Sequence, residues 1–161
     1  MEHVIHPFPP FYDADSTILI LGSFPSVKSR EQMFFYGHPQ NRFWKVMAAV
    51  FSDEIPDTIA DKKKFLSRHH VALWDVIGSC DIEGSADASI GNAVPNDLSE
   101  ILEKADIQTI IVNGKTADRY YRKFIQNTIG REAACLPSTS PANAAFGIGR
   151  LVEEWEKAIL H

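Results

Sequence analysis

The stretch TILILGSFPSVKSREQMFFYGHPQNRFW, residues 17–44, decides the fold and places the candidate site. Its first five residues are a continuous apolar run between Ser16 and Gly22, which is typical of a buried parallel strand. The small residues that follow predict a tight turn at the C-terminal edge of a sheet, where open α/β sheets bind their ligands. The aromatic residues after that turn favour a flat ligand that can stack. We therefore expect this segment to hold a planar heterocycle beside a polar group.

Length and composition indicate an ordinary globular protein. The chain has 161 residues, of which 45% are hydrophobic and 23% are charged, so we expect one domain over residues 1–161. The two cysteines, Cys80 and Cys135, are isolated and predict neither a metal site nor a disulfide. No apolar run is long enough to span a bilayer, and the N-terminus does not resemble a secretory signal. We expect a cytoplasmic monomer that does not bind membranes.

The charge distribution says more than the net charge of −5, which by itself argues against a nucleic-acid partner. Basic residues outnumber acidic ones in two separate segments, residues 22–45 and 114–150, and the remainder of the chain is acidic. If the fold brings these segments together, they form one basic face on an acidic body. The alternative is that they are ordinary solvated faces of two helices.

The remaining hydrophobic pattern alternates between strands and helices. Apolar runs at 71–76, 108–112 and 132–136 predict three more strands. Helical spacing predicts helices over 41–51, 57–69, 96–105 and 115–128 and a last one after residue 147, with Asn41, Asp57 and Asn96 as N-caps. Residues 77–95 are rich in Gly, Ser, Asp and Ala and predict a long functional or mobile loop. The pattern predicts a three-layer α/β/α sandwich around a four-stranded parallel sheet.

Every predicted strand ends in polar or turn residues. These ends are Gly22-Ser23, Asp75, Asn113-Gly114 and the segment 137–140. In a parallel sheet they lie at one edge, so we expect the site there. Trp74 and Asp75 are candidates for the wall of the pocket, and Asp75 is also credible as a cap or a buried acceptor, so we leave it outside the catalytic set.

Four segments at these positions resemble the uracil-DNA glycosylase superfamily. They are GSFPS at 22–26, GHPQNRFW at 37–44, IIVNG at 110–114 and LPSTSPANA at 136–144. Their combination looks most like the hypoxanthine (deoxyinosine) DNA glycosylase branch, and the resemblance covers roughly residues 17–155. It implies a monofunctional DNA glycosylase of base excision repair that acts on DNA containing deaminated bases. It implies no metal and no cofactor.

One departure from the family pattern relocates the expected chemistry. Many superfamily members carry Asp or Asn in the first turn to position the attacking water, and here that position looks like Phe24. In the deoxyinosine-type branch the amide is expected from the HPxN element, which makes Asn41 the candidate that orients water through its carbonyl. His38 is the second catalytic candidate, as a donor to a phosphate or to the leaving base. Without the resemblance, Asn41 reads as a plain helix N-cap and His38 as a loop histidine.

The resemblance also implies two sets of binding residues. The candidates for base binding are Gly22, Ser23, Phe24, Phe35, Tyr36 and Asn113, of which Asn113 resembles the Asn that reads the base edge in uracil-specific relatives. The candidates for DNA binding are Ser26, Ser138, Thr139, Ser140, Pro141, Ala142 and Asn143, with the residue that wedges into the DNA stack expected near Pro141 and Ala142. Lys28, Arg42 and Arg150 are candidate phosphate contacts. Ordinary core packing and a Pro/Ser surface turn are the simpler interpretations of these residue types.

The chemistry agrees with such a site. Cleavage of an N-glycosidic bond passes through an oxocarbenium-like sugar and needs a placed water and donors for the departing base. No well-marked nucleophilic lysine is present, which favours a monofunctional enzyme. The alternatives are a uracil- or mismatch-specific glycosylase, a non-catalytic nucleic-acid-binding module of the same fold, and an α/β protein that binds a phosphorylated small molecule.

Overall fold

A four-stranded parallel sheet forms the centre of the molecule, in the strand order β3-β2-β6-β7. It is seen in a computed structural model that describes residues 1–160. Its strands are β2 (Ile18–Gly22), β3 (Val71–Asp75), β6 (Thr109–Asn113) and β7 (Ala134–Leu136). The four predicted strands and the parallel sheet are thereby confirmed.

The sheet is buried on both faces, which explains why its central strands read as unbroken apolar runs. Leu19, Ile20 and Leu21 of β2 are fully inaccessible. The strands are in register at their C-terminal ends, where Gly22 pairs with Asp75 and Asn113 pairs with Leu136. The strand ends that carry polar and turn residues in the sequence therefore meet at one edge.

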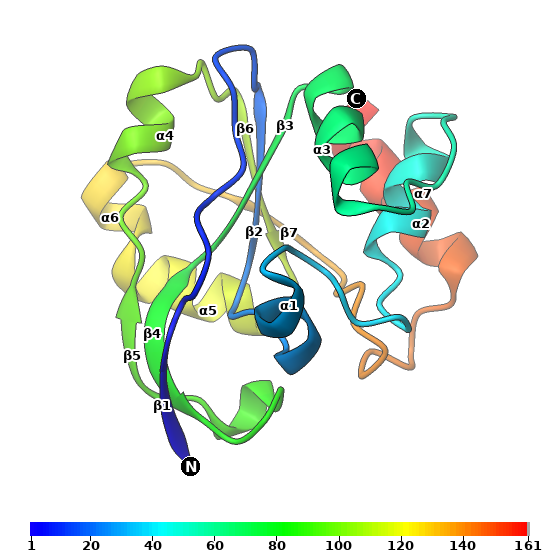
Figure 1. The fold of residues 1–161 in the computed structure, drawn as a ribbon. Helices are drawn as coiled ribbons and strands as arrows, with labels where there is room; N and C mark the ends of the chain where they lie inside the picture. Colours follow the sequence, from blue (N-terminus) through cyan, green and yellow to red (C-terminus); the bar gives the residue numbers. More distant parts are fainter. Residues whose placement is uncertain (161) are drawn as a thin grey trace.

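Helices cover both faces of this sheet and make the predicted three layers (Figure 1). On one side lie α4 (Ser99–Lys104), α5 (Lys115–Phe124) and α6 (Gln126–Ile129), and on the other lie α1 (Val27–Gln32), α2 (Phe43–Val50), α3 (Ile59–Arg68) and α7 (Ile148–Leu160). Helix α1 was not expected, and the helix expected over 115–128 is divided into α5 and α6.

The helix caps differ from expectation by one or two residues. Helix α2 starts after Arg42, although the Asn41 side chain still accepts the Phe43 N–H at 2.9 Å. Thr58, not Asp57, caps α3, because its hydroxyl accepts the Asp61 N–H. Asn96 does not cap α4, because that helix begins at Ser99.

Residues 77–95 are not the long loop that was expected. They form a hairpin of β4 (Ile77–Ile82) and β5 (Gly91–Pro95), with a 3-10 turn η1 (Asp87–Ser89) between them. Strand β1 (Glu2–Ile5) pairs antiparallel with β4 and completes a second, three-stranded sheet in the order β1-β4-β5. The residues of β4 and β5 that keep some exposure include the Ser, Asp and Asn that made the segment look like a loop. Within residues 1–160, no helix is long and apolar enough to cross a membrane.

Candidate active site

One pocket of about 340 Å³ lies at the C-terminal edge of the parallel sheet. All the predicted catalytic, base-binding and DNA-binding residues except Asn143 line it, whereas the candidate phosphate contacts Lys28, Arg42 and Arg150 do not. The pocket is also lined by Pro25, Ser29, Asp75, Ser85, Ala86 and Asp87. The turn after β2, the loop before α2, the end of β6 and the loop after β7 thus converge on one cavity. Of the additional residues, Asp75 was signalled by its strand-end position, whereas Asp87 lies in the hairpin that the sequence did not reveal.

A chain of hydrogen bonds joins the segments that resemble the family. The Thr139 hydroxyl donates to Asn41 Oδ1 at 2.9 Å and accepts from Asn113 Nδ2 at 3.0 Å. The Thr139 N–H donates to Asn113 Oδ1 at 3.1 Å, and Asn113 Nδ2 also reaches the Tyr36 hydroxyl at 3.2 Å. Thr139 is fully buried, so the expected contact of its side chain with DNA does not fit; its hydroxyl instead aligns the two asparagines.

These bonds fix which end of the Asn41 amide faces the pocket. The Phe43 N–H can only donate, so the Asn41 atom that it meets must be the carbonyl oxygen. That oxygen also accepts from Thr139, which uses both of its lone pairs. The expected role of the carbonyl in orienting water therefore does not fit this arrangement. The Asn41 Nδ2 group remains available as a donor to a bound molecule.

The His38 ring is also oriented by the backbone. Its Nδ1 accepts the Gln40 N–H at 3.1 Å, which leaves the proton of the neutral ring on Nε2. His38 lines the pocket, so Nε2 can present this N–H to a ligand. The geometry suits the donor role expected for this residue.

The loop after β7 is anchored by Arg42, which the sequence suggested as a phosphate contact. The Arg42 guanidinium donates to the carbonyl oxygens of Ser140 at 2.9 Å and Asn143 at 3.1 Å, and also to that of Phe146. The Arg42 backbone N–H donates to the Thr139 carbonyl at 3.0 Å. Because its guanidinium N–H groups donate to carbonyl oxygens of the loop, Arg42 holds the conformation of the loop and does not bind phosphate. Asn143 has a similar role, since its side chain donates to the Ser138 carbonyl at 3.0 Å.

The aromatic residues expected to stack on the base are mostly packed. Phe24 and Phe35 are only 8% and 2% exposed, and one face of Tyr36 is covered by Phe43, with ring centroids 3.9 Å apart. They form the apolar wall of the pocket.

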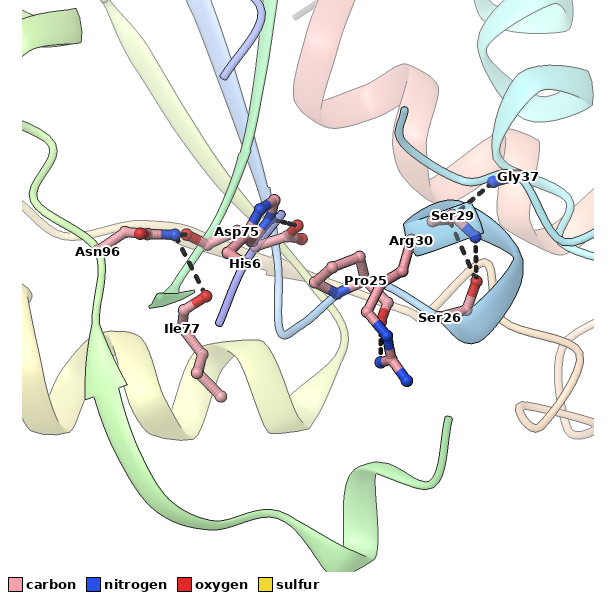
Figure 2. Close-up of polar contacts among 9 residues, drawn as sticks. All are labelled: His6, Pro25, Ser26, Ser29, Arg30, Gly37, Asp75, Ile77 and Asn96. Atoms are coloured by element: carbon pink, nitrogen blue, oxygen red, sulfur yellow. Dashed lines mark hydrogen bonds and ion pairs between the residues drawn. The ribbon is translucent and has the colours of Figure 1, made fainter. Parts of the chain in front are cut away.

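Polar contacts hold the short helix α1 in place beside the pocket, as Figure 2 shows in part. The buried Ser29 hydroxyl accepts the Gly37 N–H at 2.9 Å and contacts the Ser26 hydroxyl at 3.1 Å. Arg30 donates to the carbonyl oxygens of Pro25 at 2.9 Å and Gly84 at 3.2 Å, which ties α1 to the β4–β5 hairpin. This side of the pocket is therefore built from two segments far apart in the sequence.

Two carboxylates face the pocket. Asp75 Oδ2 lies 2.7 Å from His6 Nε2, and the Ser23 hydroxyl donates to Asp87 at 3.0 Å. Burial raises the pKa of Asp87, and the nearby Asp75 charge raises it further, against the effect of the Ser23 hydrogen bond. Burial also raises the pKa of Tyr36, and Asp75 adds to this. The pocket is thus acidic at its floor and favours hydrogen-bond donors there.

A metal site is not apparent in the described part of the chain, since residues 1–160 contain no group of three or more His, Cys, Asp or Glu side chains suited to holding an ion.

Comparisons with known proteins agree with this geometry. The model of the uracil DNA glycosylase superfamily matches residues 9–159. A hypoxanthine DNA glycosylase of Methanosarcina acetivorans is 36% identical over 156 residues, which cover 96% of this chain and 97% of the relative. A hypoxanthine DNA glycosylase of Methanosarcina barkeri is 32% identical over 138 residues, or 84% and 86% of the two chains. The solution structure of a proposed uracil DNA glycosylase from M. acetivorans superposes with a TM-score of 0.80, at 34% identity and 97% coverage of both chains.

Proposed function

The chain belongs to the uracil DNA glycosylase superfamily, and from this premise we propose that it is a monofunctional DNA glycosylase that removes hypoxanthine from DNA. In this reaction water replaces the base at C1′ of deoxyinosine and leaves an abasic site. The activity named for the two Methanosarcina relatives supports the choice of base.

The observation that carries the proposal is the convergence of Asn41, Thr139 and Asn113 at one pocket. These residues come from three segments, and two hydrogen bonds of 2.9 and 3.0 Å through the Thr139 hydroxyl align them. An enzyme that acts on a base extruded from the helix needs such a preorganised, concave site. Pro141 and Ala142 are exposed beside the pocket, which supports their assignment to DNA contact.

Each group then has a chemical role. The Asn41 Nδ2 donates to the base as it departs with negative charge, which lowers the energy of the transition state. His38 donates through Nε2 to a phosphate or to the base. The carboxylate of Asp87, which also lines the pocket, stabilises the positive charge that develops on the sugar. The packed walls of Phe24 and Phe35 exclude bulk water.

Activity can be tested with duplexes that carry a single hypoxanthine, uracil or xanthine. After incubation with excess protein, alkali cleaves any abasic product, and gel analysis gives the single-turnover rate. We expect the fastest release from the hypoxanthine duplex. The absence of abasic product from all three would reject the glycosylase, whereas a preference for uracil would support the alternative specificity.

Two substitutions test whether Asn41 acts through its amide N–H, as a donor, or through its carbonyl oxygen, as an acceptor. Asn41→Asp keeps an oxygen for the Phe43 N–H and the Thr139 hydroxyl but removes the amide donor. We expect both Asn41→Asp and Asn41→Ala to lower the single-turnover rate by about 100-fold or more, as for the loss of one transition-state donor. Asn127→Ala, at an exposed asparagine of α6, is the matched control. Wild-type turnover in Asn41→Asp would mean that the carbonyl, not the amide N–H, is needed.

The remaining assignments stay predictions: a monomer, a cytoplasmic location and DNA with deaminated bases as the partner.

A further inference from the structure

Asp75 is a deeply placed polar side chain of the pocket. It ends β3, an edge strand of the parallel sheet, opposite Gly22 of β2, and is only 4% exposed. One carboxylate oxygen, Oδ2, is held by His6 Nε2 at 2.7 Å, as Figure 2 shows. The other, Oδ1, lies over Gly22, only 2.5 Å from where a Cβ on that glycine would stand. Oδ1 therefore occupies space that any other residue at position 22 would fill.

The surroundings of His6 define which of its ring nitrogens acts as the donor. The His6 ring is enclosed by aromatic rings, with centroids of Trp74 and Phe8 at 4.4 and 4.5 Å. His6 Nδ1 is buried and has no hydrogen-bond partner among the described residues. A protonated ring would leave an N–H unsatisfied there, which is costly, whereas a neutral ring leaves only a lone pair. The His6 ring therefore donates through Nε2 to Asp75 Oδ2, and Asp75 Oδ1 remains as an acceptor.

The backbone around Asp75 is also fixed. The Asn96 side chain donates to the carbonyl oxygens of Asp75 at 2.9 Å and Ile77 at 3.2 Å. These bonds hold the junction between β3 and β4, so the carboxylate is presented from a rigid element rather than from a loop. Asp87, the other carboxylate of the pocket, lies on the hairpin and is bound by Ser23.

Deamination changes the base in a way that a carboxylate can detect. It replaces an exocyclic amino group and a ring nitrogen acceptor by a carbonyl and a ring N–H. A carboxylate is an acceptor only, so it binds the new ring N–H and repels the lone pair of an unmodified ring nitrogen. The residue expected to read this edge, Asn113, already uses both ends of its amide on Thr139 and Tyr36.

We propose that Asp75 Oδ1 accepts the ring N–H of the extruded deaminated base, N1–H of hypoxanthine, and that His6 is the positioning residue that aims it. The depth of Asp75 supports this role, because the base enters furthest while the sugar and phosphates stay near the mouth. The inference rests on the proposed function and assigns its specificity.

The orientation of the new amide in the variant Asp75→Asn is predictable. His6 Nε2–H holds the amide oxygen, because the opposite arrangement would leave a buried His6 Nδ1–H without an acceptor. The amide nitrogen of the substituted side chain then faces the pocket as a donor. It suits a base whose N1 is an unprotonated acceptor, such as unsubstituted purine.

The experiment measures kcat/KM of the wild type and of Asp75→Asn on matched duplexes that carry hypoxanthine or unsubstituted purine. We expect the preference for hypoxanthine over purine to fall at least tenfold in Asp75→Asn. His6→Phe, which fills the aromatic cage but removes the donor, should also lower this preference. Asp81→Asn is the control, because Asp81 forms a similar pair with His3 at 2.9 Å outside the pocket.

The outcomes separate the two proposals. If the wild type releases no hypoxanthine, the proposed function fails. If the wild type is active but Asp75→Asn lowers both rates equally, the function stands and the role of Asp75 is overturned. If Asp75→Asn does not fold, the wild type is tested on 1-methylhypoxanthine, where a methyl group replaces the N1 proton. We expect a rate at least 100-fold lower than for hypoxanthine, and an equal rate would overturn the inference.

Discussion

Gly22 shows how a single missing side chain can determine a site. Its backbone φ is not in the left-handed region, so conformational freedom does not explain the glycine. The reason is space: a Cβ here would lie 2.5 Å from Asp75 Oδ1 and 3.2 Å from the Tyr36 hydroxyl. In this chain the first turn thus begins with glycine because the carboxylate of the neighbouring strand lies against it.

Gly22→Ala should therefore displace the Asp75 carboxylate. We expect a loss of stability of about 1–3 kcal/mol, as for other overpacked sites, together with a marked loss of hypoxanthine release. Thermal denaturation and single-turnover rates measure the two effects. Gly91→Ala is the matched control in strand β5, since no atom lies within 4 Å of the added methyl group. Unchanged turnover in Gly22→Ala would show that the position of the carboxylate is unimportant.

At the scale of elements, the site depends on how α2 holds the loop after β7. Arg42, at the start of α2, donates to the carbonyl oxygens of Ser140, Asn143 and Phe146. A planar guanidinium can reach several carbonyl groups at once, whereas a lysine ammonium cannot reproduce this geometry. The loop that we assign to DNA contact is therefore shaped before DNA binds.

Arg42→Lys should release this loop while keeping the charge. We expect faster hydrogen exchange over 137–147 and about tenfold weaker binding to an abasic-site duplex, because the loop must be ordered on binding. Arg122→Lys, at an exposed arginine of α5, controls for general effects of replacing arginine by lysine. Exchange and affinity equal to those of the wild type would contradict an anchoring role for Arg42.

The elements that could be predicted from the sequence are those whose pattern is set by burial alone. The central parallel strands are buried on both faces, and this makes them apolar runs that stand out in the sequence. The β4–β5 hairpin was missed because it keeps polar, partly exposed residues, and because β4 pairs with β1 at the far end of the chain. Such pairing depends on tertiary contacts and leaves little local signal.

The same distinction applies to the site. The rule that parallel strands end at one edge of the sheet, together with the family motifs, correctly predicted that nearly all the candidate site residues surround one pocket. They could not show which atoms remain free: Asn113, Thr139 and Arg42 are occupied by partners that lie 26 to 104 residues away. The pair of His6 and Asp75, separated by 69 residues, had no sequence signal except the position of Asp75 at a strand end.

For the molecule as a whole, stability in acid should depend on a cluster of Asp53, Arg68 and His69 that lies outside the pocket. Asp53 lies 2.7 Å from the His69 ring and 2.8 Å from the Arg68 guanidinium, and hydrogen bonds from these two side chains lower the pKa of Asp53 to about 2. Because its pKa is lowered, the Asp53 carboxylate stabilises the fold at pH values above the ordinary pKa of an aspartate. This stabilisation is lost as the pH falls towards 2. Asp53→Asn should therefore melt below the wild type at pH 7.

The difference between the melting temperatures of the wild type and Asp53→Asn should close as the pH approaches 2. Asp106→Asn, at an exposed carboxyl, is the control and should follow the wild type throughout. A constant difference between Asp53→Asn and the wild type at every pH would mean that packing, not charge, is responsible.

The salt dependence of DNA binding tests whether the two basic segments form one DNA-binding face, although the chain has a net charge of −5. With Arg42 used inside the protein, Lys28 and Arg150 remain from the three proposed phosphate contacts, and both are exposed. Two phosphate contacts predict that log K falls with log salt with a slope of about −2. Lys28→Ala and Arg150→Ala should each reduce this slope by about one, whereas Lys64→Ala should leave it unchanged. Binding that does not depend on salt would refute the basic face, and a slope much steeper than about −2 would require further contacts from residues 114–131.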